Sequence, residues 1–255
     1  MFLSDNIQFM QEEDYCDSYE KCNMRIRIKF TKTGQLKYIG HLDVMRYFQK
    51  VLRRAHVDVV FTEGFSPHMI MSFALPLGVG IESTGEYFDV DVKDDYDIEG
   101  LTERLNRFTT PYMKVLDAVR VSDKKADKCM TLVEAADYRI DLSAADDETC
   151  RAFAEFVTAE NIMTVKKTKS GEKLTDIRPM ILSCGPAGEK CYELRLSAGS
   201  RAHLNPALLL DAFRERCGTE LPITITRTEM YTVTEGKYIP LSQTYEKDRN
   251  SQDTH

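Results

Sequence analysis

The chain lacks any stretch approaching the roughly 18 consecutive apolar residues that a membrane helix needs, so we expect no membrane span and no membrane partner. Its opening, MFLSDNIQFMQEEDY, has neither a basic flank nor a long apolar run, so it does not predict a secretory signal. Apolar residues make up 42% of the chain and charged residues 29%, which is typical of a globular protein with a real core. We therefore expect a cytoplasmic protein.

Cysteine patterns for metal or disulfide chemistry are also missing. Seven cysteines at irregular spacings fit a reducing compartment better than a disulfide framework. Cys16 with Cys22, and Cys184 with Cys191, lack the two-residue spacing of a zinc knuckle or a redox dithiol. The second pair is interpreted as two strand cysteines, with a metal or redox site that includes His203 as the alternative. The three-cysteine spacing of a radical-chemistry iron–sulfur cluster is absent too, so we expect no metal and no cofactor.

Charge is spread unevenly along the chain. The formal net charge is −7, but residues 24–70 carry nine basic and three acidic side chains, a local balance of +6, so the remainder carries −13. A local field steers an anionic ligand more than the total charge does, and this segment is therefore predicted to meet a polyanion. The alternative is a solvated basic face without a ligand.

Hydrophobic periodicity predicts the fold. RIRIKFT alternates in period two from residue 25, and residues 41–55 repeat apolar side chains at helical spacing. Further elements of this half are strands at 57–61, 69–76 and 86–92, a helix at 97–108 and a strand at 112–121. The second half repeats the order with strand 138–142, helix 147–159, strands 164–168, 179–184 and 191–197, helix 204–216 and strand 223–232. We predict an α+β fold of tandem ferredoxin-like domains, with antiparallel sheets and helices packed on one face.

Composition predicts the boundaries of these domains. Residues 1–23 are acidic and predict a flexible leader, while the polar run SDKKADKC predicts a linker at 123–130. The two domains are then expected at 24–122 and 131–240, and the polar residues 241–255 predict a disordered tail. No residue-level repeat is visible, and KLTDIRP fits no element cleanly.

Two histidines are the candidates for catalysis. His41 lies at the start of the predicted helix after Gly40, where the helix dipole would keep the imidazole neutral, as a general base acting on RNA requires. The alternative is that His41 packs against the preceding loop. His68, which follows a proline, is the second candidate base or ligand. Asp43 at the third helical position is explained by the unsatisfied N–H groups of the first turn.

Basic and aromatic side chains predict a nucleic-acid interface. The helix and the preceding strand supply the predicted phosphate contacts, which are Arg25, Arg27, Lys29, Lys37, Arg46, Lys50, Arg53 and Arg54. The candidate stacking residues are Tyr38, Tyr47 and Phe65, each with a place in the core as its alternative. Four lysines on a predicted hairpin, with Arg201 and His203, form either a second anion contact or a wet surface; they are Lys166, Lys167, Lys169 and Lys173.

Several motifs resemble one known family. They are FTKTGQLKYIGHLDVMR from Phe30 to Arg46, EGFSPH and SFALPLGV between Glu63 and Val79, TDIRP at 175–179 and the NPxLLL helix at 205. The chain resembles, from about residue 24 to 235, the radical-SAM-associated family, a bacterial domain family of unknown function. Its members occur alone or joined to radical SAM proteins with cobalamin-binding domains.

This resemblance implies a radical SAM protein with a cobalamin-binding domain as partner. The basic segment separately predicts RNA or a ribosome-related substrate. The leading hypothesis is a non-catalytic accessory module that binds RNA or a ribonucleoprotein substrate for that partner. A metal-independent endoribonuclease-like enzyme is the first alternative, and tandem ferredoxin-like domains resemble CRISPR-repeat ribonucleases at fold level. A protein–protein adaptor without nucleic acid is the second.

Overall fold

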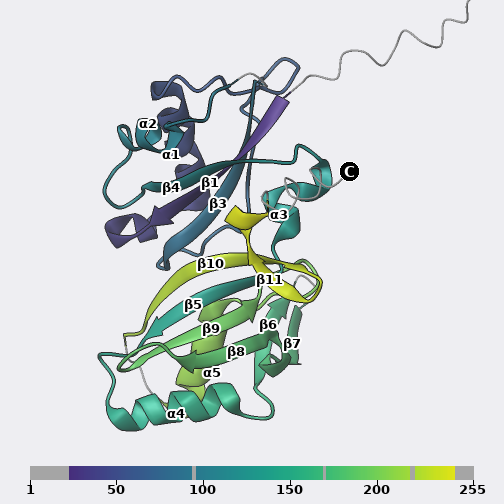
Figure 1. The fold of residues 1–255 in the computed structure, drawn as a ribbon. Helices are drawn as coiled ribbons and strands as arrows, with labels where there is room; N and C mark the ends of the chain where they lie inside the picture. Colours follow the sequence, from purple (N-terminus) through teal and green to yellow (C-terminus); the bar gives the residue numbers. More distant parts are fainter. Residues whose placement is uncertain (1–22, 94–95, 169–170, 219–221, 245–255) are drawn as a thin grey trace, which may run out of the picture.

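The computed structural model describes residues 23–93, 96–168, 171–218 and 222–244, and Figure 1 shows their arrangement. The first half consists of β1 (Asn23–Lys32), α1 (His41–Arg54), β2 (Met71–Phe73), β3 (Glu82–Lys93), α2 (Leu101–Asn106) and β4 (Val115–Val121). The second half repeats this order with β5 (Ala135–Asp141), α4 (Asp147–Thr158), β8 (Ile181–Pro186), β9 (Cys191–Ser197), α5 (Pro206–Cys217) and β10 (Thr224–Thr234).

Strand order confirms the predicted fold class. β4, β1, β3 and β2 lie side by side in the first half, and β10, β5, β9 and β8 lie in the equivalent order in the second. Each half is therefore a ferredoxin-like β-α-β-β-α-β unit with antiparallel neighbours. The predicted helix at 204–216 is also confirmed as α5, where the Asn205 side chain caps the helix by accepting a hydrogen bond from the Ala207 N–H and Pro206 is the first helical residue.

The two halves share one sheet. β3 and β10 pair in parallel through Thr226 with Glu82 and Arg227 with Ser83, so nine of the described strands form one sheet that runs through both halves, while β6 and β7 form a separate two-stranded sheet. β11 (Lys237–Pro240) adds to the far part of β10. The predicted boundaries at 24–122 and 131–240 follow the two halves, but whether each half folds as an independent domain stays a prediction.

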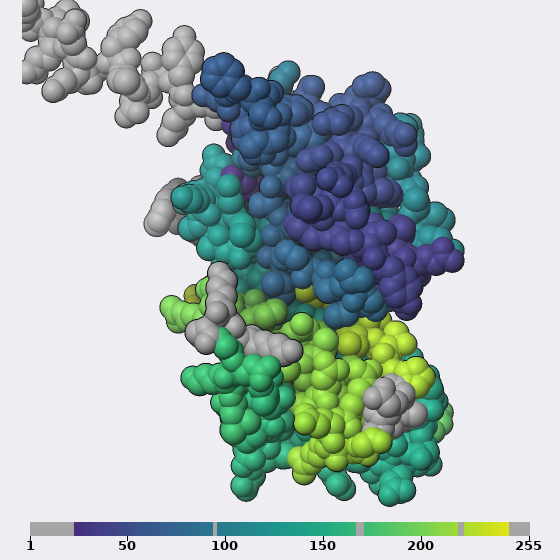
Figure 2. Space-filling view, turned by 180° about the vertical axis from the view of Figure 1, so that it is seen from behind, coloured from purple at the N-terminus to yellow at the C-terminus, as the bar shows by residue number. Residues whose placement is uncertain are grey.

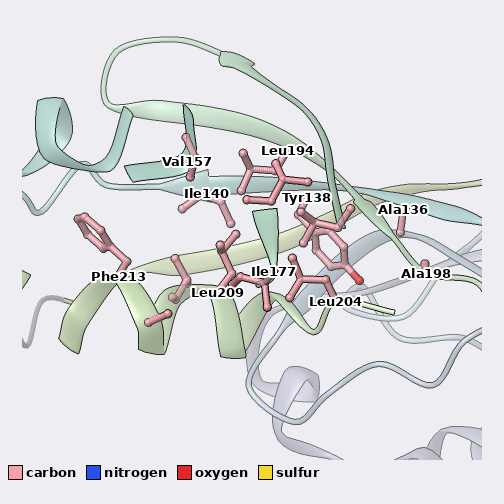
Figure 3. Close-up of a cluster of buried hydrophobic side chains, with 14 of the residues drawn as sticks. Ala136, Tyr138, Ile140, Val157, Ile177, Leu194, Ala198, Leu204, Leu209 and Phe213 are labelled. Atoms are coloured by element: carbon pink, nitrogen blue, oxygen red, sulfur yellow. The ribbon is translucent and has the colours of Figure 1, made fainter. Parts of the chain in front are cut away.

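Each half has its own hydrophobic core on the helix face of the sheet. In the first half, Ile26, Ile28 and Phe30 of β1 pack against Phe48 and Leu52 of α1. In the second half the alternate residues of β5 and β9 meet α4 and α5, and Figure 3 shows Tyr138, Ile140, Leu194, Leu209 and Phe213 in this cluster. The period-two alternation then turns the other strand residues to the opposite face of the sheet.

Three segments differ from their predictions. Residues 57–61, predicted as a strand, form only isolated bridges. The predicted linker contains a short 3-10 turn, Lys125–Asp127, and leads into α3 (Cys129–Leu132), whose first residue is fully buried. KLTDIRP lies in β7 (Gly171–Asp176), which pairs with β6 (Met163–Thr168), and in a 3-10 turn.

The predicted disorder of the tail is wrong at its beginning. Leu241–Gln243 forms a 3-10 turn, and Leu241 is fully buried because it packs into the second core. The rest of the tail and the acidic leader, apart from Asn23 in β1, lie outside the described residues. Within the described ranges, no helix combines the length and the apolar content needed to cross a bilayer.

Candidate nucleic-acid interface

The basic side chains of β1 are enclosed rather than presented to solvent. Arg25 is 5% exposed and Arg27 1% exposed, and their guanidinium Nε atoms lie 2.8 Å from carboxylate oxygens of Asp91 and Asp89 on the neighbouring strand. Lys29 is partly buried and pairs with Glu229 of the other half at 2.7 Å. The prediction that these three residues face outward to a phosphate backbone is therefore wrong, because each is already neutralised by a carboxylate.

Arg27 connects four segments of the chain. Besides its two bonds to Asp89, it donates to the Asp127 carbonyl at 2.8 Å, to the Leu241 carbonyl at 3.2 Å and to the Thr244 hydroxyl at 2.8 Å. Burial opposes its charge, but the Asp89 carboxylate outweighs burial and raises the pKa of Arg27. Its role is to hold the segment between the two halves and residues 241–244 against the sheet.

A signal for this pairing is present in the sequence. Asp89 and Asp91 alternate in β3 with the same period of two as Arg25 and Arg27 in β1, and the antiparallel register places each acid directly opposite a base. Cross-strand pairs of opposite charge stabilise a sheet. If β1 and β3 are taken as neighbouring strands, the sequence predicts these ion pairs. The pattern of β1 alone suggested a free basic face.

The predicted contacts on α1 remain at the surface. Arg46, Lys50, Arg53 and Arg54 are all exposed, and Figure 2 shows this purple helix on the outer surface of the upper lobe. Arg46 has only a long, exposed contact of 3.4 Å with Asp43. In the described part of the chain, no carboxylate forms an ion pair with Lys50, Arg53 or Arg54. Lys37, by contrast, is partly buried and pairs with Glu82 at 3.3 Å.

A projecting loop follows α1. Phe61 and Met69 bridge its base, and the Thr62 N–H donates to the His68 carbonyl at 2.9 Å. Between them Phe65 is fully exposed, and Gly64 has φ +110°, which favours glycine. Of the three candidate stacking residues, Phe65 and Tyr38 are exposed, while the Tyr47 hydroxyl accepts from the Thr110 N–H and its ring packs on Phe48.

The two candidate catalytic histidines lie in unlike surroundings. His41 packs edge-on against Phe73, with ring centroids 4.9 Å apart, beside a pocket of about 10 Å³ that holds one water molecule at most. The same pocket is lined by Lys32, which is 2% exposed and donates to the Ile39 carbonyl; burial lowers the pKa of its amine. His68 instead bonds Thr62 at 3.0 Å and fixes the projecting loop. A catalytic role for either stays a prediction.

The lysine hairpin of the second half is formed by β6 and β7. Lys166 lies directly opposite Lys173, and its amine donates to the His203 carbonyl at 3.0 Å. The hairpin therefore contacts the His203 segment through Lys166, and Arg201 is exposed two positions before His203. Lys169 and the side chain of Lys167 lie outside the described part of the structure. Cys184 and Cys191 lie on β8 and β9 without facing each other in register. In the described ranges no three His, Cys, Asp or Glu side chains are grouped to hold a metal ion.

Sequence reasoning did not single out the polar pairs that join the halves. Arg227 of β10 and Glu86 of β3 form a buried bidentate ion pair, and Glu229 bonds both Lys29 and the Tyr87 hydroxyl. It also did not find Asp137 and Arg195, which pair on β5 and β9 at 2.7 Å. The predicted ferredoxin-like topology makes β5 and β9 neighbours, but no sequence pattern indicated the pairing of β3 with β10 that joins the halves.

Solved structures with a similar course of the chain are remote. The chain aligns with a structure described as a Cbf5-Nop10-Gar1 complex at 10% identity and a TM-score of 0.40, over 82% of this chain and 49% of that one. It thus spans about half the length of that chain. It also aligns with an unknown protein from Galdieria sulphuraria (11% identity, TM-score 0.25, 83% of this chain and 99% of that one). A putative glycine cleavage system transcriptional repressor gives 11% identity, a TM-score of 0.24, and coverage of 80% and 98%.

TM-scores of this size carry no argument about function, and no curated protein matches the chain. A family model does match, over residues 25–206, which include the β1 cations, α1 and the projecting loop and end at the first residue of α5. That span exceeds two thirds of the chain and covers the first half and the second half as far as the start of α5. The chain belongs to the bacterial family described as "Uncharacterized protein conserved in bacteria (DUF2344)".

Proposed function

We propose that this protein is a non-catalytic module that binds single-stranded RNA. The observation that carries the proposal is the exposed face of α1, where Lys50, Arg53 and Arg54 have no carboxylate partner in the described structure. Cations of this kind contact phosphates and release counterions, which gives affinity with little sequence choice. The fully exposed Phe65 supplies an aromatic face at the end of the loop that follows α1.

The internal pairing of the other cations supports this choice of surface. Arg25, Arg27, Lys29 and Lys37 are bound by acids of the same chain, so a polyanion would have to displace short ion pairs to reach them. Three of the four α1 cations, Lys50, Arg53 and Arg54, form no ion pair in the described structure that RNA would have to displace. The proposed interface is therefore half of the set predicted from the sequence, with Phe65 added.

A radical SAM protein with a cobalamin-binding domain is proposed as the partner that performs chemistry on the bound RNA. Its support is the resemblance of the GHLD and SFALPLGV segments to radical-SAM-associated sequences. Affinity capture of the tagged chain from native lysate, with RNA sequencing and mass spectrometry of one eluate, tests this. Recovery of a radical SAM protein with one RNA class is expected, and recovery of neither contradicts the partnership.

The RNA proposal is tested by electrophoretic mobility shift of a 20-nucleotide single strand across a salt series. The triple variant Lys50→Gln/Arg53→Gln/Arg54→Gln should weaken binding and reduce the slope of log K against log salt by about 2, since each phosphate contact to a single strand contributes about 0.7. The matched control is Lys114→Gln/Lys124→Gln/Lys125→Gln, which removes three exposed cations elsewhere.

An equal loss of slope in both variants would mean that only total charge matters and would contradict a defined interface. A wild-type protein that does not shift RNA, but binds an acidic protein partner through α1, would favour the adaptor hypothesis instead. RNA cleavage that His41→Ala abolishes without lowering the melting temperature would favour the endoribonuclease hypothesis.

A further inference from the structure

The sheet of the second half has a face that its helices do not cover. Ile140, Leu194 and Met230 point from β5, β9 and β10 into the core formed with α4 and α5. Alternation places Asp137, Arg195 and Tyr231 on the opposite face, which is turned toward the viewer in Figure 1. These three side chains are polar or aromatic, and Arg195 remains partly exposed.

Four residues on this face form one connected cluster. The Arg195 guanidinium donates through Nε and NH2 to the two carboxylate oxygens of Asp137, at 2.7 and 2.8 Å. The Tyr231 hydroxyl donates to the same carboxylate at 2.8 Å. Tyr238 of β11 completes the cluster, with its ring centroid 6.3 Å from that of Tyr231 in an edge-on arrangement. Asp137 is 5% exposed, so its charge is held inside the cluster.

The cluster holds the Arg195 guanidinium in one orientation while its NH1 group remains available for a further hydrogen bond. Its guanidinium carbon lies 4.2 Å from the Tyr231 ring centroid and 4.8 Å from that of Tyr238. Its side chain is 25% exposed, and within the described residues its NH1 group makes no hydrogen bond. An oriented guanidinium with free N–H donors is suited to the paired acceptors on the edge of a nucleobase.

Tyr238 supplies the stacking surface. It is 37% exposed, and no hydrogen bond of its hydroxyl occurs among the described side chains. Proteins hold single-stranded RNA by stacking unpaired bases on aromatic side chains of an open sheet, with arginine planes and base-edge hydrogen bonds beside them. We propose that the open face of the second half binds a base of single-stranded RNA, stacked on Tyr238 and hydrogen-bonded by Arg195.

Charge on the same face favours a base over a phosphate as the group bound there. Along β5 and β9 three acids outnumber two bases on this face: Asp137, Asp141 and Glu193 against Arg139 and Arg195. These carboxylates would repel a phosphate backbone, whereas they would not repel a neutral base. This inference rests on the proposed RNA binding but concerns the face of the sheet opposite α1, so the two are separable by experiment.

The test uses the absence of tryptophan from the chain. In Tyr238→Trp the full-length protein has a single tryptophan, and stacking of a base should quench its fluorescence during titration with a 10-nucleotide single-stranded RNA. Tyr112→Trp, which places the probe at an exposed tyrosine of the first half, should show no quenching. Tyr238→Ala should weaken RNA binding about 5- to 150-fold, the range of one lost base stack, with an unchanged salt slope. Arg195→Lys should weaken it as well, because a lysine keeps the charge but loses the planar fork.

The outcomes separate the two proposals. The inference is overturned, and the proposed function remains, if RNA binding depends on α1 but the tryptophan at position 238 is not quenched. In that case Tyr238→Ala should bind RNA as tightly as the parent does. Quenching that persists in the α1 triple variant supports the inference. Quenching by uridine or guanosine monophosphate but not by the oligonucleotide overturns it in favour of a free-nucleotide site. Failure to bind RNA at all overturns both proposals.

Discussion

Arg227 and Glu86 form a bidentate ion pair across the line where the two halves meet. The Arg227 Nε lies 2.7 Å from one carboxylate oxygen and NH2 lies 2.6 Å from the other, and both side chains are nearly buried. Arg227 also donates to the Leu75 carbonyl at 2.7 Å, so one guanidinium joins β10 to two segments of the first half. The carboxylate outweighs the effect of burial and raises the pKa of Arg227.

Breaking this pair from one side should be costly. Arg227→Met leaves the Glu86 carboxylate buried without a partner, and we expect a loss of about 3–5 kcal/mol in the free energy of unfolding. The double variant Glu86→Leu/Arg227→Met should recover much of that loss because no unpaired charge remains. Urea unfolding followed by circular dichroism measures both. A loss below about 1 kcal/mol in the single variant would contradict a buried pair.

Gly85 permits the close approach of β3 to β10. A Cβ atom at this position would lie 2.3 Å from the Thr228 carbonyl oxygen, which is backbone and cannot move aside alone. Gly85→Ala should therefore disrupt the junction between the halves and lower the melting temperature. Gly185→Ala is the control, since its strand position has no atom within 4 Å and alanine there should be neutral or slightly stabilising. Equal effects of the two variants would mean that general strand propensity, and not contact at the junction, causes the loss.

The elements that the sequence predicted well depend on local patterns. The period of 3.6 in residues 41–55 and the Asn205–Pro206 capping pair specify α1 and α5 from residues close in the chain, and both helices form. The site was predicted less well because its outcome depends on neighbours far along the chain. Arg27 forms hydrogen bonds with Asp89 and Leu241, which are 62 and 214 positions away in the chain. The periodicity within β1 alone does not indicate these partners.

Because Arg27 is buried, we expect its replacement to change stability and not the salt dependence of RNA binding, which is the opposite of the expectation for the α1 cations. Arg27→Gln should lower stability, because it leaves Asp89 without its ion-pair partner and removes bonds to two other segments, at Asp127 and at residues 241–244. At a temperature where the variant remains folded, its salt slope for RNA binding should equal that of the parent, since Arg27 contacts no phosphate. Melting curves and the mobility-shift salt series provide the two measurements. A slope reduced by about 0.7 would mean that Arg27 meets RNA directly.

Because Phe65 is exposed, we expect its replacement to weaken RNA binding without changing stability. Phe65→Ala removes a side chain that contacts almost nothing in the fold, so the melting temperature should stay within error while RNA affinity falls by roughly 1–3 kcal/mol. Phe48→Ala is the opposite case, because Phe48 is 1% exposed among Phe30, Tyr47 and Phe88, and its truncation should cost about 3–5 kcal/mol of stability. A large stability loss in Phe65→Ala would show that the loop packs on the protein in solution.

His203 makes stability depend on pH. His203 is exposed at the surface, as His56 is, but partial desolvation together with the nearby charges of Lys166 and Arg227 lowers the pKa of its imidazole below the ordinary value of 6.5. Between the folded pKa and 6.5 the unfolded chain binds more protons than the folded chain, so stability rises with pH in this window and is lost as the pH falls through it. His203→Asn should therefore lose less stability than the parent between pH 7 and pH 5, measured by urea unfolding at each pH.

The control for this effect is His56, an exposed histidine with φ +52°, a conformation that asparagine also adopts. His56→Asn should leave the pH dependence of the parent intact. If His203→Asn and His56→Asn flattened the curve equally, the effect would come from general histidine titration and not from the cations around His203. Because Lys166 contributes to the shift, Lys166→Gln should move the curve in the same direction as His203→Asn by a smaller amount, which locates the cause in the contact between the hairpin and the His203 segment.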